Sequence, residues 1–167
     1  MQTTSQSSFQ PGQGVPSPTL QFKKVLAPVD FSERSQNSLR YTVKFARQHD
    51  SKLILLHVVE PVMYPAEEGV ATFVSSPVDS TCEPAKAKPA QWKNTEIRQP
   101  ITVEIMLRRG PAYNENAEAA KEIGVDLIII STHGYTGLKH VLMGSTAKRV
   151  VRHAPCPILA IRQTIGS

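Results

Sequence analysis

The sequence contains little cysteine, few aromatic residues and no long apolar run. Its two cysteines, Cys82 and Cys156, are too few for a disulfide framework and match no metal-binding pattern. We therefore expect two free thiols in a reducing cytosol. No apolar run approaches the roughly 20 residues of a membrane-spanning helix, and the first residues lack the basic and apolar regions of a secretory signal. These absences predict a cytoplasmic protein without a membrane partner.

Basic charge is present, but it is not concentrated in one place. Lysine and arginine number 19 against 14 acidic residues, which gives a net charge of +5. This balance suits phosphate-bearing ligands in a general way. No Lys/Arg stripe is interleaved with aromatic residues, so we expect no nucleic-acid partner. The five histidines show no ligand-type pairing with cysteine or with one another, so we expect no metal site.

The chain is long enough for one domain. Its 167 residues fall within the usual range for a single domain. Residues 1–21 are rich in Gln, Ser, Thr, Pro and Gly, a composition typical of a disordered tail. We expect one domain over 22–163 and a short C-terminal tail over 164–167.

Short apolar runs alternate with segments of helical periodicity. Leu39, Val43 and Ala46 share one helix face, and Ala147, Val150 and Val151 are expected to point inward from the last helix. Six prolines between 60 and 100 predict irregular loop there, with one short helix around 90–97 and Pro89 at its first turn. The other predicted helices cover 32–49, capped by Ser32, 111–124, closed by Gly124 as a left-handed cap, and 144–154. The predicted strands cover 23–30, 52–59, 101–109, 126–131 and 156–162.

This alternation predicts an α/β fold with a doubly wound, five-stranded parallel sheet and helices on both faces, which is a Rossmann-like arrangement. Such sheets bind ligands at the carboxyl ends of strands where the strand order reverses. Asp30 ends the first strand, and a glycine-containing segment after the fourth strand leads to Gly144-Ser145-Thr146 at a helix start. A helix N-terminus favours an anion, although the same residues also suit a plain turn and cap.

These segments resemble the universal stress protein family. The family signature G-x2-G-x9-G-(S/T) is matched by Ser131-Thr-His-Gly134, nine further residues, and Gly144-Ser145. KKVLAPVDFSERS, LILLHVVEP and APCPILAIR also resemble family blocks, and the similarity covers residues 22–163. Two departures stand out, because Ser131 replaces the first glycine and 60–100 is proline-rich where the family usually has a long second helix.

The resemblance implies an adenine nucleotide α-hydrolase-like fold that binds ATP, with any Mg²⁺ held by the phosphates, and a homodimer through the last strand. Pro28, Val29 and Asp30 would lie by the adenine and ribose, with Val58 against the base. The remaining implied contacts are Ser131, His133 and Gly134 in the loop and Gly144, Ser145 and Thr146 at the phosphates.

The function expected from this resemblance is that of an ATP-binding regulatory protein, a nucleotide switch in a stress response. No catalytic residues are assigned, and at most a slow ATP hydrolysis is expected. Two other readings stay open: a nucleotide-free dimeric interaction module, and an α-hydrolase-type enzyme, for which the first loop offers only Ser32 and Ser35. His57 is expected to be a satisfied core residue, while His133 suits either a phosphate contact or a strand cap.

Overall fold

Five short apolar runs form one parallel sheet in a computed structural model that describes residues 21–61, 82–97, 100–132 and 143–162. The strands are β1 (Lys24–Val29), β2 (Lys52–Val59), β3 (Val103–Arg109), β4 (Leu127–Ser131) and β5 (Ile158–Ile161). Their order is β3-β2-β1-β4-β5, so β1 is central and the chain crosses it between β3 and β4. The doubly wound parallel sheet predicted from the sequence is confirmed.

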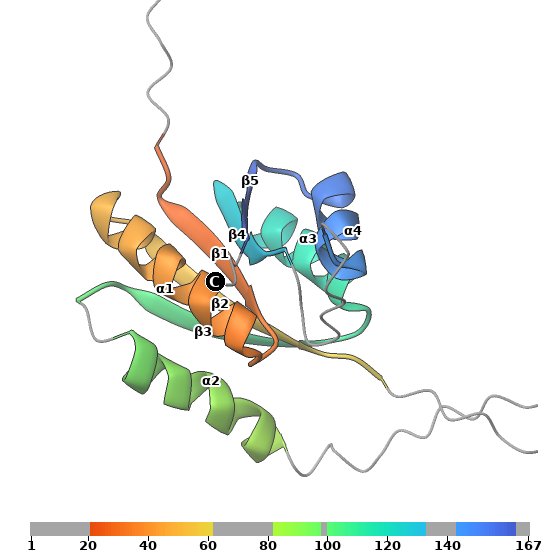
Figure 1. Cartoon of the computed structure of the whole chain (residues 1–167), viewed down its shortest axis with the longest axis horizontal. Coiled ribbons are helices and arrows are strands. Elements are labelled where there is room, and N and C mark those ends of the chain that lie inside the picture. The colour runs from red at the N-terminus through yellow and green to blue at the C-terminus, as the bar shows by residue number, and fades with distance from the viewer. Residues whose placement is uncertain (1–20, 62–81, 98–99, 133–142, 163–167) are drawn as a thin grey trace, which may run out of the picture.

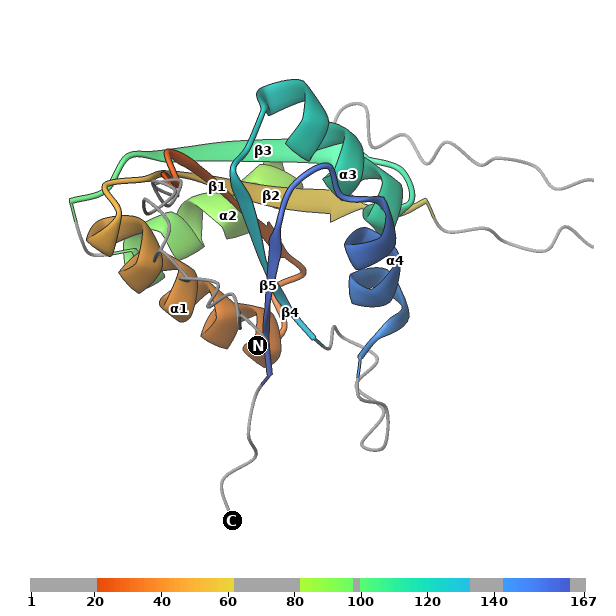
Figure 2. The same cartoon turned by 90° about the horizontal axis from the view of Figure 1, so that it is seen from above.

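Four helices cover the two faces of this sheet. They are α1 (Glu33–Gln48), α2 (Cys82–Glu96), α3 (Ala112–Ile123) and α4 (Ser145–His153). Helices α1 and α2 lie on one face, and α3 and α4 lie on the other (Figures 1 and 2). In the described ranges, no helix combines the length and the apolar character needed to cross a bilayer.

Side chains alternate between the two faces along each strand. Leu26, Leu56 and Ile130 pack in the cluster that includes Ala119, Ala120, Ala147 and Val150 of α3 and α4. Their neighbours Ala27 and Leu55 pack instead against Leu39, Val43 and Ala46 of α1. Strands buried on both faces read as continuous apolar runs, which is the pattern that made them recognisable.

Local signals set the helix ends as expected. The Ser32 side chain accepts a hydrogen bond from the Ser35 N–H and caps α1. Gly124 ends α3 in the left-handed region with φ of 64°. Gly144 is the N-cap of α4, as its position at the predicted helix start indicated.

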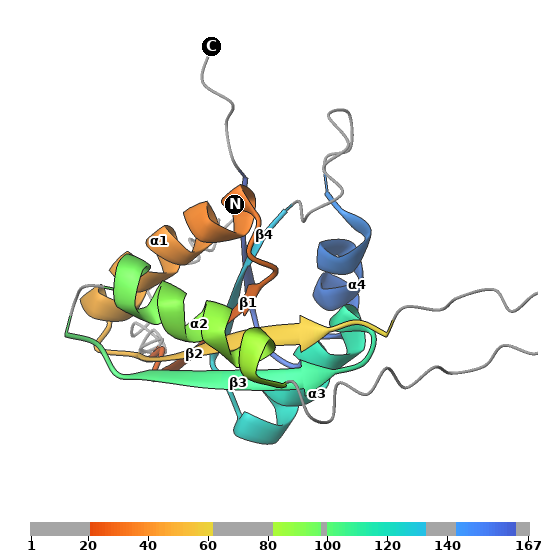
Figure 3. The same cartoon turned by 90° about the horizontal axis from the view of Figure 1, so that it is seen from below.

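Helix α2 corrects the prediction for this part of the chain. It covers Cys82–Glu96 with Pro89 in its interior, rather than only 90–97 with Pro89 at the first turn. Proline removes one intrahelical hydrogen bond, but Pro89 is fully buried, and Trp92 and Ile97 pack against the α1 face of the sheet. Figure 3 shows α2 lying across β2 and β3. Tertiary packing therefore outweighs the local proline signal, while residues 62–81 of the predicted loop lie outside the described ranges.

The predicted inward face of α4 is wrong at one position. Ala147 and Val150 are buried, whereas Val151 is 49% exposed. One residue corresponds to about 100° of rotation along a helix. Val151 therefore turns away from the cluster that buries Val150, toward a side that no described element covers.

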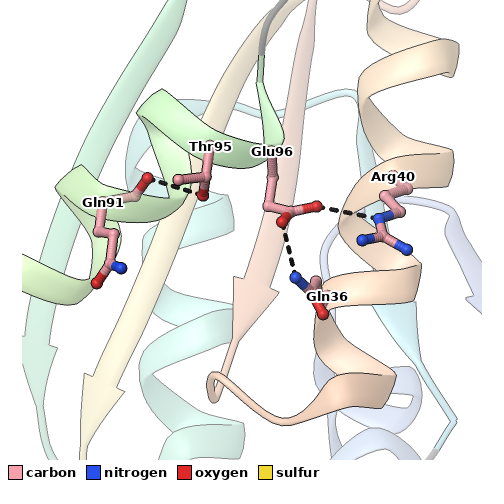
Figure 4. A network of polar contacts seen from close by, with 5 residues as sticks. All are labelled: Gln36, Arg40, Gln91, Thr95 and Glu96. Carbon is pink, nitrogen blue, oxygen red and sulfur yellow. Dashed lines mark hydrogen bonds and ion pairs between the residues drawn. The ribbon is translucent and has the colours of Figure 1, made fainter.

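A polar contact joins the last residue of α2 to the first half of α1 (Figure 4). Glu96 accepts hydrogen bonds from Gln36 Nε2 at 2.7 Å and from Arg40 Nε at 3.0 Å. The Glu96 side chain is only 14% exposed, whereas that of Arg40 is 59% exposed. The half-buried Gln36 contact is therefore screened less than the Arg40 ion pair, and it fixes the last turn of α2 against α1.

Replacing Glu96 with alanine should lower the free energy of unfolding by about 1 kcal/mol, because two hydrogen bonds to one carboxylate are lost. Arg40→Ala is the matched control and should cost less, since it removes only the exposed half of the contact. Urea unfolding followed by circular dichroism measures both. An equal loss in the two variants would contradict the ranking of the two contacts.

Candidate functional site

A cavity of about 310 Å³ lies at the carboxyl edge of the sheet, within the size range of small-molecule sites. It is bounded by the ends of β1, β2 and β4 and by the first turns of α3 and α4. β1 and β4 pair at Val25–Leu127 and Leu26–Ile128, yet both strands continue beyond these pairs. The cavity therefore opens at the strand-order reversal, where β1 and β4 have stopped pairing.

All of the predicted site residues within the described ranges line this one cavity. They come from segments about a hundred residues apart in sequence and are brought together by the crossover between β3 and β4. His133 and Gly134, together with Tyr135, lie outside the described residues. The predicted residues in the cavity lining are Pro28, Val29, Asp30, Val58, Ser131, Gly144, Ser145 and Thr146.

The corner between β1 and α1 holds Asp30 in a defined position. Its Oδ1 accepts hydrogen bonds from the Ser32 N–H at 3.0 Å and the Ser32 hydroxyl at 2.6 Å. The Asp30 N–H in turn donates to Ser35 Oγ at 3.2 Å. The Ser32 hydroxyl thus both caps α1 and orients Asp30, so one serine fixes the helix start and the carboxylate.

Phe31 adopts a backbone conformation that is rare for a bulky residue, with φ of 61°. Such a conformation costs on the order of 1–3 kcal/mol. The Phe31 ring packs 4.6 Å from the His57 ring and 5.0 Å from the Trp92 ring, centroid to centroid. His57 also forms a hydrogen bond through Nδ1 with the Val29 carbonyl at 2.9 Å. His57 is therefore a partly buried, hydrogen-bonded residue that supports the corner from behind.

The first turn of α4 lines the cavity from Gly144 to Ala147. The Gly144 N–H donates to the Thr132 carbonyl at 2.6 Å, which ties the helix start to the end of β4. No side chain in the described residues caps this helix, so its first-turn N–H groups and the positive end of its dipole favour an anion there. Ser145 is exposed and Thr146 half-buried, and both carry hydroxyls into the lining.

Seven residues of the lining were not among the predicted site residues: Ser35, Leu56, Glu60, Ala112, Asn116, Ile130 and Ala147. Glu60 follows the carboxyl end of β2, as Asp30 follows β1, and its Oε1 accepts the Ala112 N–H at 2.9 Å. The strand-end rule that selected Asp30 could have found it. Asn116 is a buried polar residue on the alanine-rich face of α3, and that break in an apolar face was the available signal.

The charge within the lining is divided between two sides. Asp30 and Glu60 place carboxylates at the ends of β1 and β2, while the α4 N-terminus presents partial positive charge. The described lining contains no lysine or arginine. Within the described ranges no three metal-ligating side chains cluster together. An anion here would therefore be held by backbone and hydroxyl groups.

The two serines of the β1–α1 corner, Ser32 and Ser35, already have structural partners, which argues against a nucleophilic role for them. Ser32 caps α1 and bonds Asp30, and Ser35 Oγ accepts the Asp30 N–H. Cys156 is a free thiol away from the lining. Burial and then the nearby Asp126 raise its pKa, so the reactive thiolate is disfavoured. The side chain of Cys82 lies outside the described part of the chain.

The sequence model of the universal stress protein family matches residues 21–162. The chain belongs to this family. A relative in the same family, universal stress protein A homolog 2 of Coxiella burnetii, is 34% identical over 146 residues, which span 84% of this chain and 95% of the relative.

Solved structures of universal stress proteins share the fold. The structure of MJ0577, a universal stress protein of Methanocaldococcus jannaschii, has a TM-score of 0.73 at 29% identity and covers 87% of this chain and 99% of its own. A universal stress protein from Archaeoglobus fulgidus in complex with dAMP has a TM-score of 0.58 at 20% identity, covering 85% of this chain and 98% of its own. The latter similarity concerns the fold alone.

In this universal stress protein, Ser32→Ala should lower the free energy of unfolding by about 1 kcal/mol, because α1 loses its side-chain cap. Ser32→Asn keeps a capping oxygen and serves as the matched control, with a smaller loss. Thermal or urea unfolding measures the difference. Equal stability of wild type and the alanine variant would show that the cap contributes nothing to the corner.

Proposed function

We propose that the cavity binds an adenine nucleotide, with ATP as the physiological ligand, and that the protein acts as a cytoplasmic nucleotide switch. The observation that carries this proposal is the convergence of an uncapped helix N-terminus and two strand-end carboxylates on one cavity. A nucleotide has the complementary layout, with an anionic end and an end rich in hydrogen-bond donors. Because this chain belongs to the universal stress protein family, the dAMP complex of the family member from Archaeoglobus fulgidus supports the choice of adenine.

The phosphates are assigned to the first turn of α4. Gly144 allows close approach, and the N–H groups that follow, with the Ser145 and Thr146 hydroxyls, donate to phosphate oxygens. Gly144 has φ of −64° and ψ of 158°, a conformation open to any residue. Its glycine therefore serves to leave space beside the helix start, and Ser131 at the end of β4 completes this side. His133 and Gly134 are proposed to continue the phosphate loop.

The base and ribose are assigned to the ends of β1 and β2. Pro28, Val29 and Val58 offer apolar surface to the base. Asp30, exposed at the cavity rim, suits ribose hydroxyls, because a carboxylate accepts hydrogen bonds and repels phosphate. This polarity sets the orientation of the nucleotide along the cavity.

The residues present fit Mg²⁺ as a companion of the phosphates rather than as a resident ion. Asp30 and Glu60 are the only carboxylates in the described lining, and both accept hydrogen bonds from the protein. Mg²⁺ takes oxygen ligands and keeps several waters. Mg²⁺ would therefore bind through phosphate oxygens and water. It would balance the negative charge of the phosphates, because the described lining has no lysine or arginine to do so.

Purification provides a direct test of the ligand. Mass spectrometry of the supernatant from heat-denatured protein should detect ATP in a fixed ratio to the chain. Recovery of nucleotide-free protein that also fails to bind added ATP in calorimetry would contradict the proposal and favour an interaction module.

Gly144→Val should abolish ATP binding without unfolding the protein, because the new side chain occupies the space proposed for phosphate. Ser145→Ala should weaken ATP binding by about 0.5–1.5 kcal/mol, or up to about 3 if its partner is a charged oxygen. Ser145→Thr keeps the hydroxyl and is the matched control. Isothermal titration with ATP and AMP measures each variant.

AMP should be less sensitive than ATP to Ser145→Ala if the hydroxyl serves the distal phosphates. Unchanged ATP affinity in Gly144→Val, with an intact circular dichroism spectrum, would return this segment to the role of a simple turn and cap.

We also propose a homodimer through β5. This strand lies at the sheet edge and pairs with β4 in the described structure. Leu159 is 40% exposed on it, and Val151 of α4 is also exposed. An uncovered edge strand with apolar neighbours favours pairing with another chain, and a two-fold axis would join two copies of the same edge.

Leu159→Lys should shift the protein to monomer, because it places charge on the proposed interface without removing a backbone N–H. Thr102→Lys, beside the opposite edge strand β3, is the control and should leave assembly unchanged. Light scattering at micromolar concentration measures the mass. A monomeric wild type would contradict the dimer.

A further inference from the structure

Asn116 is the buried polar side chain of α3, only 3% exposed, and it lines the candidate cavity. The other buried residues of this helix are alanines. An amide in an otherwise apolar helix face is costly to bury unless its polar atoms find partners. The hydrogen-bond partners of the Asn116 amide therefore indicate the role of this side chain.

Half of the Asn116 amide is satisfied within the helix. Its Nδ2 donates to the Ala112 carbonyl at 2.7 Å. This contact fixes which atom is oxygen, because the reversed amide would set two acceptor oxygens against each other. The Oδ1 atom is closed to solvent and has no hydrogen-bond partner among the described residues. The unmatched group is thus specifically an acceptor.

An acceptor of this kind requires a donor from the ligand. Phosphate oxygens are acceptors, so the phosphate end of a nucleotide is excluded as its partner. Ribose hydroxyls are matched better by the exposed carboxylates of Asp30 and Glu60 at the rim. The buried apolar lining from Leu56 and Ile130 suits the base, whose remaining donor is its exocyclic amine.

We propose that Asn116 Oδ1 accepts a hydrogen bond from the exocyclic amine of the base and so selects adenine over 6-oxo purines. The inference rests on the adenine-nucleotide function proposed above. Asn116 lines the cavity while its Oδ1 is closed to solvent, so the contact requires the amide to rotate on binding, about a torsion that is soft in asparagine. A 6-oxo purine would place an oxygen against Oδ1 instead, which is repulsive.

ATP and inosine triphosphate differ at this one group and are the probes. In isothermal titration, wild type should prefer ATP. Asn116→Leu should weaken ATP binding roughly three- to tenfold, which corresponds to one lost hydrogen bond. The affinity for inosine triphosphate should not fall, so the ratio of the two affinities should shrink by the same factor. Asn114→Leu, on the exposed face of the same helix, is the matched control and should change neither affinity.

Two further measurements separate this role from a structural one. Asn116→Leu should not lower the melting temperature of the ligand-free protein, since it removes an unmatched buried oxygen. Asn116→Ala repeats the titration with a smaller side chain in case leucine does not fit. The ratio of ATP to dATP affinity should stay constant in both variants, because the contact is to the base rather than to the ribose.

An ATP preference over inosine triphosphate that survives in both Asn116 variants would overturn the proposal, and Oδ1 would then be matched by buried water. A changed dATP ratio would also overturn it, in favour of a ribose contact. In either case wild type still binds ATP, so the proposed function stands. Wild type that binds neither triphosphate would instead remove the proposed function and this inference together.

Discussion

The parting of β1 and β4 is the constraint on which the site depends. β1 keeps its register with β2 along its whole length but pairs with β4 at only two positions, Val25 and Leu26. Beyond them both strands continue without pairing to each other. α3 leads into β4 and α4 follows it, and the first turns of both helices line the cavity that opens there. The strand order therefore determines where the cavity lies, and the lining side chains determine which ligand it can bind.

Much of this arrangement could be predicted from the sequence because its signals are local. Apolar runs predicted the strands, Ser32 and Gly124 predicted helix ends, and the strand-end rule placed Asp30 and Ser131 at the same edge of the sheet. The extent of α2 could not be predicted, since Pro89 is accommodated by burial against distant elements. Val151 was misplaced because helical periodicity does not say how wide a face the neighbouring elements cover. Asn116 was missed because the side of α3 that meets the cavity depends on the packing of α3 against α4.

The described lining combines directional groups with little fixed charge. Lysine or arginine would attract any polyanion over a distance, whereas N–H and hydroxyl groups act only at contact and with defined geometry. The carboxylates of Asp30 and Glu60 also repel a phosphate group from their side of the cavity. Such a site fixes the orientation of a bound ligand more than it attracts anions in general. It also suits reversible occupancy, which the proposed nucleotide switch requires.

The strained corner at Phe31 links the cavity to a helix that contributes nothing to the described lining. Trp92, the chain's single tryptophan, reaches from α2 to the back of the Phe31 ring, one residue from Asp30. An indole in contact with a residue held at positive φ is sensitive to any movement of that backbone. The protein therefore contains its own optical reporter, whose emission would follow the state of the β1 corner without a label or an added probe.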